Sequence, residues 1–230
     1  MTMERRQVFL LHYAGGNIYS FRFMEPFLKN VSYIPLELPG RGKRIREPLL
    51  NNFNEATLDI CQQIIKQLSA EKFFIYGHSM GTLIGLKVVA MLEQISLFPE
   101  CLIVTGCPGP GTGITKRRYL MGKEEFMAEL DKLGGMPAEL YTNTELFDFY
   151  EPILRADFEL AETGSLSAFS PVKTPIHAIM GNDEEHVTQI NNWKNFTLAS
   201  FNSEIWEGDH FFIHKNAARI AGKIKDFYYL

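Results

Sequence analysis

The chain has 230 residues, of which 46% are hydrophobic and 22% charged, and its formal net charge is −4 at pH 7. This length and composition suit one globular domain with a sizeable core. The negative balance and the lack of a basic stripe argue against a nucleic-acid partner. No stretch approaches the roughly 18 uninterrupted apolar residues of a membrane span, so we expect no membrane association.

The cysteines and the N-terminus indicate the compartment. Cys61, Cys101 and Cys107 lack metal-ligand spacing and leave an odd thiol under any pairing. Reduced thiols in the cytoplasm explain this pattern best. The apolar run at residues 8–11 is far too short for a secretory signal. We therefore expect a cytoplasmic protein, and we expect it to be a monomer.

The first half of the chain alternates short apolar runs with helical patterns. Strands are predicted at residues 7–11, 33–38, 73–76 and 101–105, and helices at 18–29, 54–68 and 80–92. The expected buried face of the second helix consists of Leu58, Cys61, Ile64, Ile65 and Leu68. Strands that alternate with helices indicate a mostly parallel sheet with helices on both faces.

The alternation stops after residue 106. A glycine–proline loop at 107–111 leads into helical patterns at 123–133, 144–154 and 155–163, with a breaker cluster at 133–137. We predict a helical lid insertion at approximately 107–170, over the carboxyl edge of the sheet. Strands at 175–180 and 203–206 and helices at 190–198 and 216–228 then complete a single domain over residues 1–230.

A serine stands between a predicted strand and a predicted helix. Gly77 and Gly81 flank Ser79 in a G-x-S-x-G pattern, which is the strand–turn–helix context of a nucleophile elbow. The tight turn strains the serine backbone and leaves no room for side chains two residues before and after it. The pattern also occurs by chance in glycine-rich loops, so the rest of the chain decides its meaning.

Three chemically competent positions follow the ends of predicted strands. They are Ser79, the neighbouring carboxylates Asp183 and Glu184, and His210. Ligands of parallel sheets bind beyond these ends, and the order serine, acid, histidine is that of the α/β-hydrolase fold. We predict Ser79 as nucleophile, His210 as general base, and one carboxylate that fixes the histidine tautomer.

The oxyanion hole is expected to consist of two backbone N–H groups, those of Met80 and Ala14. His78 is expected to orient the elbow. The remaining histidines are interpreted as structural or surface groups; they are His12, His177, His186 and His214. Since no pair of histidines has metal-ligand spacing and the triad needs no other group, we expect no metal and no cofactor.

Taken together, these motifs resemble the type II thioesterases that accompany nonribosomal peptide and polyketide synthases. The resemblance covers nearly the whole chain and rests on the segments at residues 12–16, 38–42, 77–81, 133–137, 154–158 and 208–212. The family usually has proline where His12 stands. The resemblance implies a serine thioesterase that hydrolyses acyl groups from phosphopantetheinyl carrier proteins and clears mis-primed or stalled modules. Alternatives are a medium-chain acyl-carrier thioesterase of fatty acid synthesis and a general carboxylesterase.

The family pattern places the triad acid three residues after a glycine, where this chain has Glu184. The register of the following Val187 and Thr188 favours Glu184, because a residue one place off points differently from the turn. Asp183 is the alternative acid, brought into place by a small shift in the turn.

The resemblance also implies carrier domains as partners, and these are usually acidic. Two candidate docking patches are Arg41, Lys43, Arg44 and Arg46, and Lys116, Arg117 and Arg118; either set can equally serve to solvate a loop. The acyl chain is expected under the lid against Phe126, Met127, Met136, Phe147 and Phe149, each of which can alternatively pack the lid. Arg155 and Asp157 are expected to pair within the lid.

Overall fold

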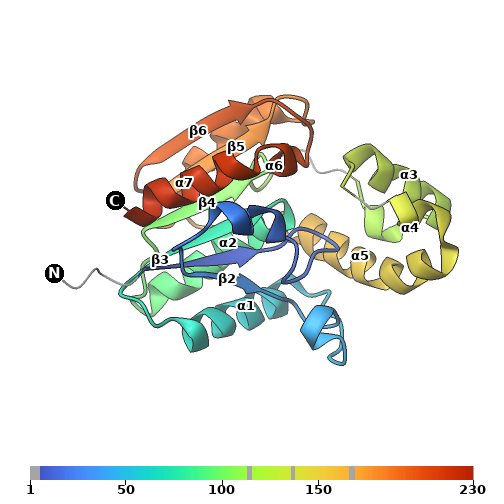
Figure 1. Ribbon diagram of the computed structural model, residues 1–230, viewed down its shortest axis with the longest axis horizontal. Coiled ribbons are helices and arrows are strands. Elements are labelled where there is room, and N and C mark those ends of the chain that lie inside the picture. Colours follow the sequence, from blue (N-terminus) through green and yellow to red (C-terminus); the bar gives the residue numbers. More distant parts are fainter. Residues whose placement is uncertain (1–5, 113–115, 136–137, 166–168, 230) are drawn as a thin grey trace.

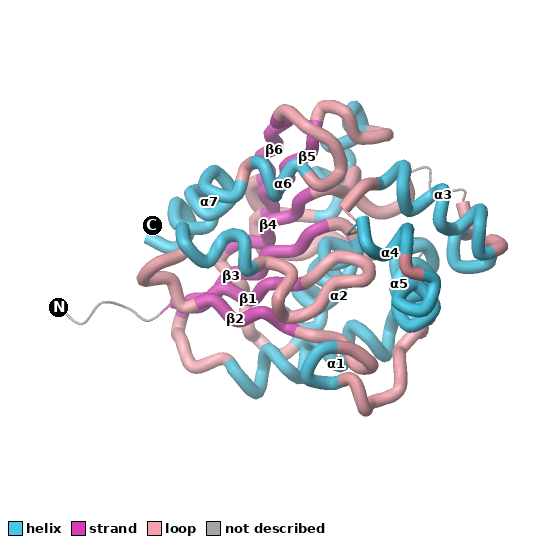
Figure 2. The backbone as a smooth tube through the Cα atoms, turned by 45° about the vertical axis from the view of Figure 1, so that its right-hand side comes forward, coloured by secondary structure: helices cyan, strands magenta, loops and turns pink. Residues whose placement is uncertain are grey.

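A six-stranded parallel sheet forms the centre of the molecule. The computed structural model describes residues 6–112, 116–135, 138–165 and 169–229. Its strands are β1 (Arg6–Leu11), β2 (Tyr33–Leu36), β3 (Lys72–His78), β4 (Cys101–Thr105), β5 (Ile176–Gly181) and β6 (Phe201–Trp206). They lie in the order β2-β1-β3-β4-β5-β6, and every recorded pairing is parallel (Figure 2). The predicted α/β architecture is confirmed.

Helices cover both faces of this sheet. α1 (Phe53–Gln67) and α2 (Met80–Gln94) lie on one face, and α7 (Ala217–Tyr229) lies on the other, after the short α6 (Phe212–Lys215) (Figure 1). Side chains alternate along each strand, so Phe9 packs with the helices of the first face and Val8 with α7. Because both faces are covered, the strands read as nearly continuous apolar runs.

Three helices form the lid to one side of the sheet (Figure 1): α3 (Lys123–Leu133), α4 (Ala138–Thr142) and α5 (Thr144–Ser165). The helical patterns predicted at 144–154 and 155–163 belong to one helix, since α5 is continuous and contains Pro152. Buried Leu154, Phe158 and Leu160 hold this part of α5 between the lid and the body, where it packs against α1 and α2. This packing stabilises α5 even though Pro152 lies inside it.

Two predicted α-helices are 3-10 helices instead, at Arg22–Phe27 and Val187–Phe196. Pro26 lies inside the first, where it has no N–H to donate to the preceding turn. The predicted buried face of α1 is also too broad, because Leu58 and Ile65 are 48% and 44% exposed.

The cysteines are all free and buried. Within the described ranges, no helix is long and apolar enough to cross a bilayer. The same ranges contain no group of three or more histidine, cysteine or acidic side chains arranged to hold a metal ion.

Candidate active site

The turn between β3 and α2 gives Ser79 an unusual backbone conformation. Its φ of +52° and ψ of −117° lie outside the regions that non-glycine residues normally adopt. A side chain at Gly81 would place its Cβ 2.4 Å from the carbonyl oxygen of Leu11, and one at Gly77 would lie 2.4 Å from the carbonyl oxygen of Gly81. Glycine is therefore sterically required at both positions, as the motif predicts.

Ser79, His210 and Glu184 form a continuous chain of hydrogen bonds. His210 Nε2 lies 3.0 Å from Ser79 Oγ, and His210 Nδ1 lies 2.8 Å from Glu184 Oε2. The other carboxylate oxygen of Glu184 accepts the N–H of Gly181 at 2.7 Å. Since an ionised carboxylate can only accept, the Nδ1 hydrogen faces Glu184 and Nε2 is free to accept the serine proton.

The structure brings Glu184, and not Asp183, to the histidine. The Glu184 side chain is 4% exposed. Asp183 is exposed; its backbone N–H donates to the carbonyl of Gly208, and no contact with His210 is recorded. The two neighbouring carboxylates thus leave the same turn in different directions.

Two residues of the cavity lining have a backbone N–H without a protein acceptor among the described residues. Met80 begins α2, so its N–H has no intrahelical partner. In the loop after β1, the N–H groups of Gly15 and Gly16 donate to Asp157 and Tyr13, whereas none is recorded for Ala14. Met80 and Ala14 line the same cavity as Ser79.

This cavity has a volume of about 890 Å³ and lies between the sheet's carboxyl edge and the lid. Its apolar lid wall is formed by Leu130, Leu133, Leu140, Leu146, Leu154 and Phe158. Cys107 also lines it, but burial raises the pKa of its thiol, which favours the protonated form over a thiolate nucleophile.

The predicted acyl contacts in the lid lie elsewhere. Phe126 and Phe147 are buried in the lid's own apolar cluster, and Met127 packs against it. Phe149 is 58% exposed. Met136 lies outside the described residues. The periodic pattern does not distinguish the side of the lid that faces the cavity from the side that holds the lid together or from the side that faces solvent.

A charged cluster forms another part of the cavity wall. Glu129 accepts hydrogen bonds from Lys116 and Lys132, each at 2.8 Å, and the bonds to these two ammonium groups lower its pKa to about 2. Arg118 bonds Glu162 at 3.0 Å. Ion pairs thus engage Lys116 and Arg118 of one predicted docking patch.

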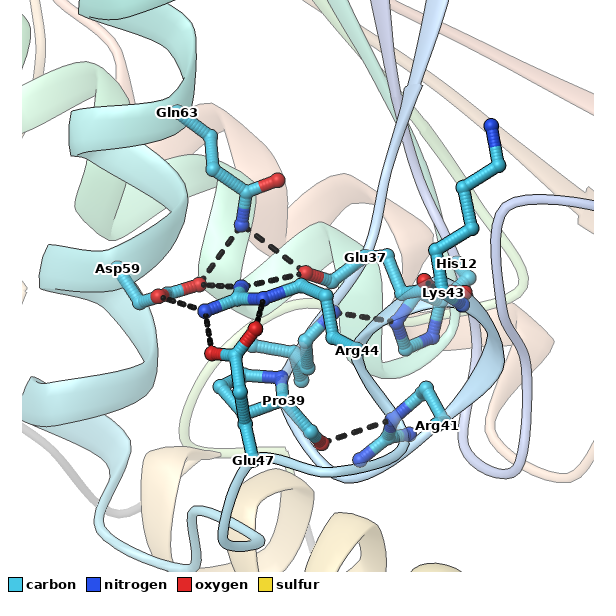
Figure 3. A network of polar contacts seen from close by, with 10 residues as sticks. His12, Glu37, Pro39, Arg41, Lys43, Arg44, Glu47, Asp59 and Gln63 are labelled. Carbon is cyan, nitrogen blue, oxygen red and sulfur yellow. Dashed lines mark hydrogen bonds and ion pairs between the residues drawn. The ribbon is translucent and has the colours of Figure 1, made fainter.

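In the other predicted docking patch, Lys43 and Arg46 are exposed, whereas Arg41 and Arg44 are paired with carboxylates. Arg41 is only 2% exposed and bonds Asp157, with Nη2 to Oδ1 at 2.8 Å. Arg44 bonds Asp59 of α1 and Glu47 of its own loop (Figure 3). The predicted exposure of Arg41 is therefore wrong.

Pairing within the lid also differs from the prediction. Arg155 bonds Glu151, one helical turn earlier, with Nε to Oε1 at 2.8 Å, and Asp157 bonds Arg41 instead. The partners Arg41 and Asp157 are 116 positions apart, and no local pattern in the sequence links them.

His78 is fully buried beside the candidate base. Its Nδ1 lies 2.9 Å from Thr105 Oγ1, and its ring centroid lies 5.1 Å from that of His210. Burial holds the pKa of His78 well below its usual value, so this ring is neutral. A positive charge that develops on His210 therefore meets no second imidazolium.

Comparison with known proteins agrees with this geometry. The Thioesterase domain family matches residues 6–228. The gramicidin S biosynthesis protein GrsT of Aneurinibacillus migulanus is 31% identical, with 94% of this chain and 86% of that protein covered. Linear gramicidin dehydrogenase LgrE of Brevibacillus parabrevis is 29% identical, with 98% and 89% covered.

A solved structure and a more distant relative extend the comparison. The crystal structure of ClbQ from the colibactin NRPS/PKS pathway has a TM-score of 0.89 and is 27% identical, with 97% of each chain covered. The medium-chain S-acyl fatty acid synthase thioesterase of Rattus norvegicus is 23% identical over 88% of this chain and 79% of its own. The resemblance expected from the motifs is confirmed, and the chain belongs to the thioesterase domain family, with the α/β-hydrolase fold.

Proposed function

We propose that this protein is a serine thioesterase that releases acyl groups from phosphopantetheinyl carrier domains of a nonribosomal peptide or polyketide synthase. The observation that carries the proposal is the hydrogen-bonded series Ser79, His210 and Glu184 in the wall of a cavity that also has an apolar lid wall. The names of the relatives support the synthase context, since GrsT belongs to gramicidin S biosynthesis and ClbQ to the colibactin pathway.

In the proposed mechanism, Ser79 Oγ attacks the thioester carbonyl while His210 Nε2 takes its proton. Glu184 holds the Nδ1 hydrogen and stabilises the imidazolium that forms. The N–H groups of Met80 and Ala14 receive the negative charge on the carbonyl oxygen. Collapse of the intermediate breaks the carbon–sulfur bond, and the proton on His210 passes to the departing thiol.

Deacylation repeats these steps with water. His210 removes a proton from a water molecule that attacks the Ser79 ester, and the same proton then returns to Ser79 as the free acid leaves. The proposed mechanism uses no metal or cofactor, because the thiol of a thioester is a better leaving group than the amine of an amide. We place the enzyme in the cytoplasm, with its three buried cysteines reduced.

The acyl group is proposed to lie against the apolar lid wall of the cavity. The proposed role of the enzyme is to clear mis-primed or stalled modules of the synthase. The second candidate is a role in fatty acid synthesis. It is supported by the name of the rat relative, which is less similar to this chain (23% identical) than GrsT (31% identical).

The test compares three substrates carrying the same acyl group. These are an acylated synthase carrier domain, an acylated fatty-acid carrier protein and the corresponding p-nitrophenyl ester. We expect the highest kcat/KM with the synthase carrier domain and no turnover by Ser79→Ala. Better turnover of the fatty-acid carrier would support the second candidate, and better turnover of the free ester would contradict both.

A further inference from the structure

The proposed oxyanion donor Ala14 lies in a tight turn after β1. The N–H of Gly16 donates to the carbonyl of Tyr13 at 2.9 Å, which closes the turn, and Gly15 adopts a φ of +75° at its third position. A Cβ at Gly16 would lie 2.8 Å from the Tyr13 carbonyl oxygen. The N–H of Ala14, the second residue of this turn, therefore points away from the Gly16–Tyr13 hydrogen bond.

His12 holds the peptide that carries this N–H group. Its Nδ1 lies 2.8 Å from the carbonyl oxygen of Tyr13, and its Nε2 lies 3.4 Å from the backbone nitrogen of Leu38. Figure 3 shows the second contact beside the loop after β2. A backbone N–H can only donate, so Nε2 accepts and Nδ1 carries the hydrogen that binds Tyr13.

The direction of the Ala14 N–H follows from this bond. In a planar trans peptide the C=O and N–H point in opposite directions, so fixing the Tyr13 carbonyl fixes the Ala14 N–H. His12 is 3% exposed, which leaves the imidazole no route to a different partner in solvent.

A second group fixes the next peptide of the turn. Asp157 of α5, which is fully buried, accepts the Gly15 N–H at 2.7 Å and is itself held by Arg41. The peptides on both sides of Ala14 are thus anchored, one by His12 directly after β1 and one by Asp157 of α5.

We propose that His12 is a positioning residue, whose Nδ1–H aims the Ala14 N–H at the oxyanion that forms above Ser79. The inference rests on the proposed function and adds a residue to it. His12 does not touch the substrate. It acts through the Tyr13–Ala14 peptide, and the Arg41–Asp157 pair supports the same turn from the other side.

Two amide substitutions separate the roles of the two ring nitrogens. The amide nitrogen of Asn takes the place of Nδ1 and can still donate to Tyr13, whereas the amide of Gln extends toward the place of Nε2. We expect His12→Asn to retain most of kcat. We expect His12→Gln and His12→Leu to lower kcat by about 10- to 100-fold with little change in KM. This loss is smaller than the roughly 10²- to 10³-fold loss of kcat that follows complete removal of an oxyanion-hole donor, because the Ala14 N–H is still present. His177→Leu is the matched control, a buried histidine bonded to Glu204 and outside the cavity.

Affinity for a trifluoromethyl ketone analogue of the acyl group provides a readout that a purely structural role would not move. Its adduct with Ser79 carries the oxyanion, so its affinity should fall in parallel with kcat/KM, while affinity for the free acid product stays constant. Equal kcat for the Asn and Gln variants, or unchanged ketone affinity in His12→Gln, overturns the inference. If His12→Leu does not fold, the Asn and Gln pair still decides. Activity that survives Ser79→Ala would instead overturn the proposed function itself.

Discussion

Replacing Asp157 with leucine should destabilise the fold strongly. The change leaves the guanidinium of Arg41, only 2% exposed, without its carboxylate, and removes the acceptor of the Gly15 N–H. Loss of one partner of a buried pair costs about 3–5 kcal/mol. An unpaired buried N–H adds about 1 kcal/mol or more. Since a domain of this size loses about 2–4 °C of Tm per kcal/mol, we expect Asp157→Leu to lower the Tm by roughly 8–24 °C.

Urea unfolding followed by circular dichroism measures this cost, provided that the m value stays constant. The matched control is Lys123→Met, which breaks an exposed pair with Asp148 and should cost at most about 1 kcal/mol. The double variant Arg41→Met/Asp157→Leu removes both buried charges, so it should be more stable than Asp157→Leu alone. A loss below about 1 kcal/mol in Asp157→Leu, or no recovery in the double variant, would refute the reasoning.

Three further predictions concern the site and its loops. Glu184→Gln should lower kcat on an acylated carrier domain by about 10⁴-fold, whereas Asp183→Asn should leave it nearly unchanged; the reverse result would make Asp183 the acid. Gly81→Ala should sharply reduce the Tm because its Cβ meets a β1 carbonyl at 2.4 Å, while Gly222→Ala, with open space around it, should raise stability slightly; equal effects would contradict the steric argument. Burial, with Arg41 adding to it, lowers the pKa of His12 from 6.5 to about 4, so the unfolded chain binds a proton in this interval that the folded protein does not. Stability should therefore fall from pH 6.5 toward pH 4, by up to about 3 kcal/mol from this group, and His12→Asn should flatten that profile in urea titrations at each pH.

The sequence predicts those site residues whose positions follow from the end of a strand or from a short spacing between neighbouring residues. Ser79 follows β3 between two glycines, and Glu184 and His210 follow β5 and β6, so the topology of a parallel sheet brings them to one edge. Glu184 could be preferred over Asp183 because the position three residues after Gly181 lets its carboxylate accept that residue's N–H while facing His210. These relations need only local geometry and one rule of topology.

The contacts that support the site, such as the Arg41–Asp157 pair, join residues far apart in the sequence, and hydrophobic periodicity does not predict such pairs. The resemblance includes the segments that contain Arg41 and Asp157, but it gives no pairing between them, and basic residues in a loop are usually exposed. The α-helical spacing of residues 18–29 and 190–198 likewise does not distinguish an α-helix from a 3-10 helix, since both place apolar residues on one face.

The lid contacts the body on both sides of the candidate active site. Leu154 of α5 lies so close to Gly15 that a Cβ there would be 2.6 Å from its Cδ2. Gly135, between α3 and α4, lies against the ring of Phe211, the neighbour of His210, at a distance that leaves no room for a Cβ. Opening the lid as one body would therefore separate it from the loop after β1 and from the loop that carries His210. Asp157 on α5 also accepts the Gly15 N–H, so such a motion would remove one of the contacts that hold the turn after β1, while the hydrogen bond from Gly16 to Tyr13 and the contact with His12 would remain.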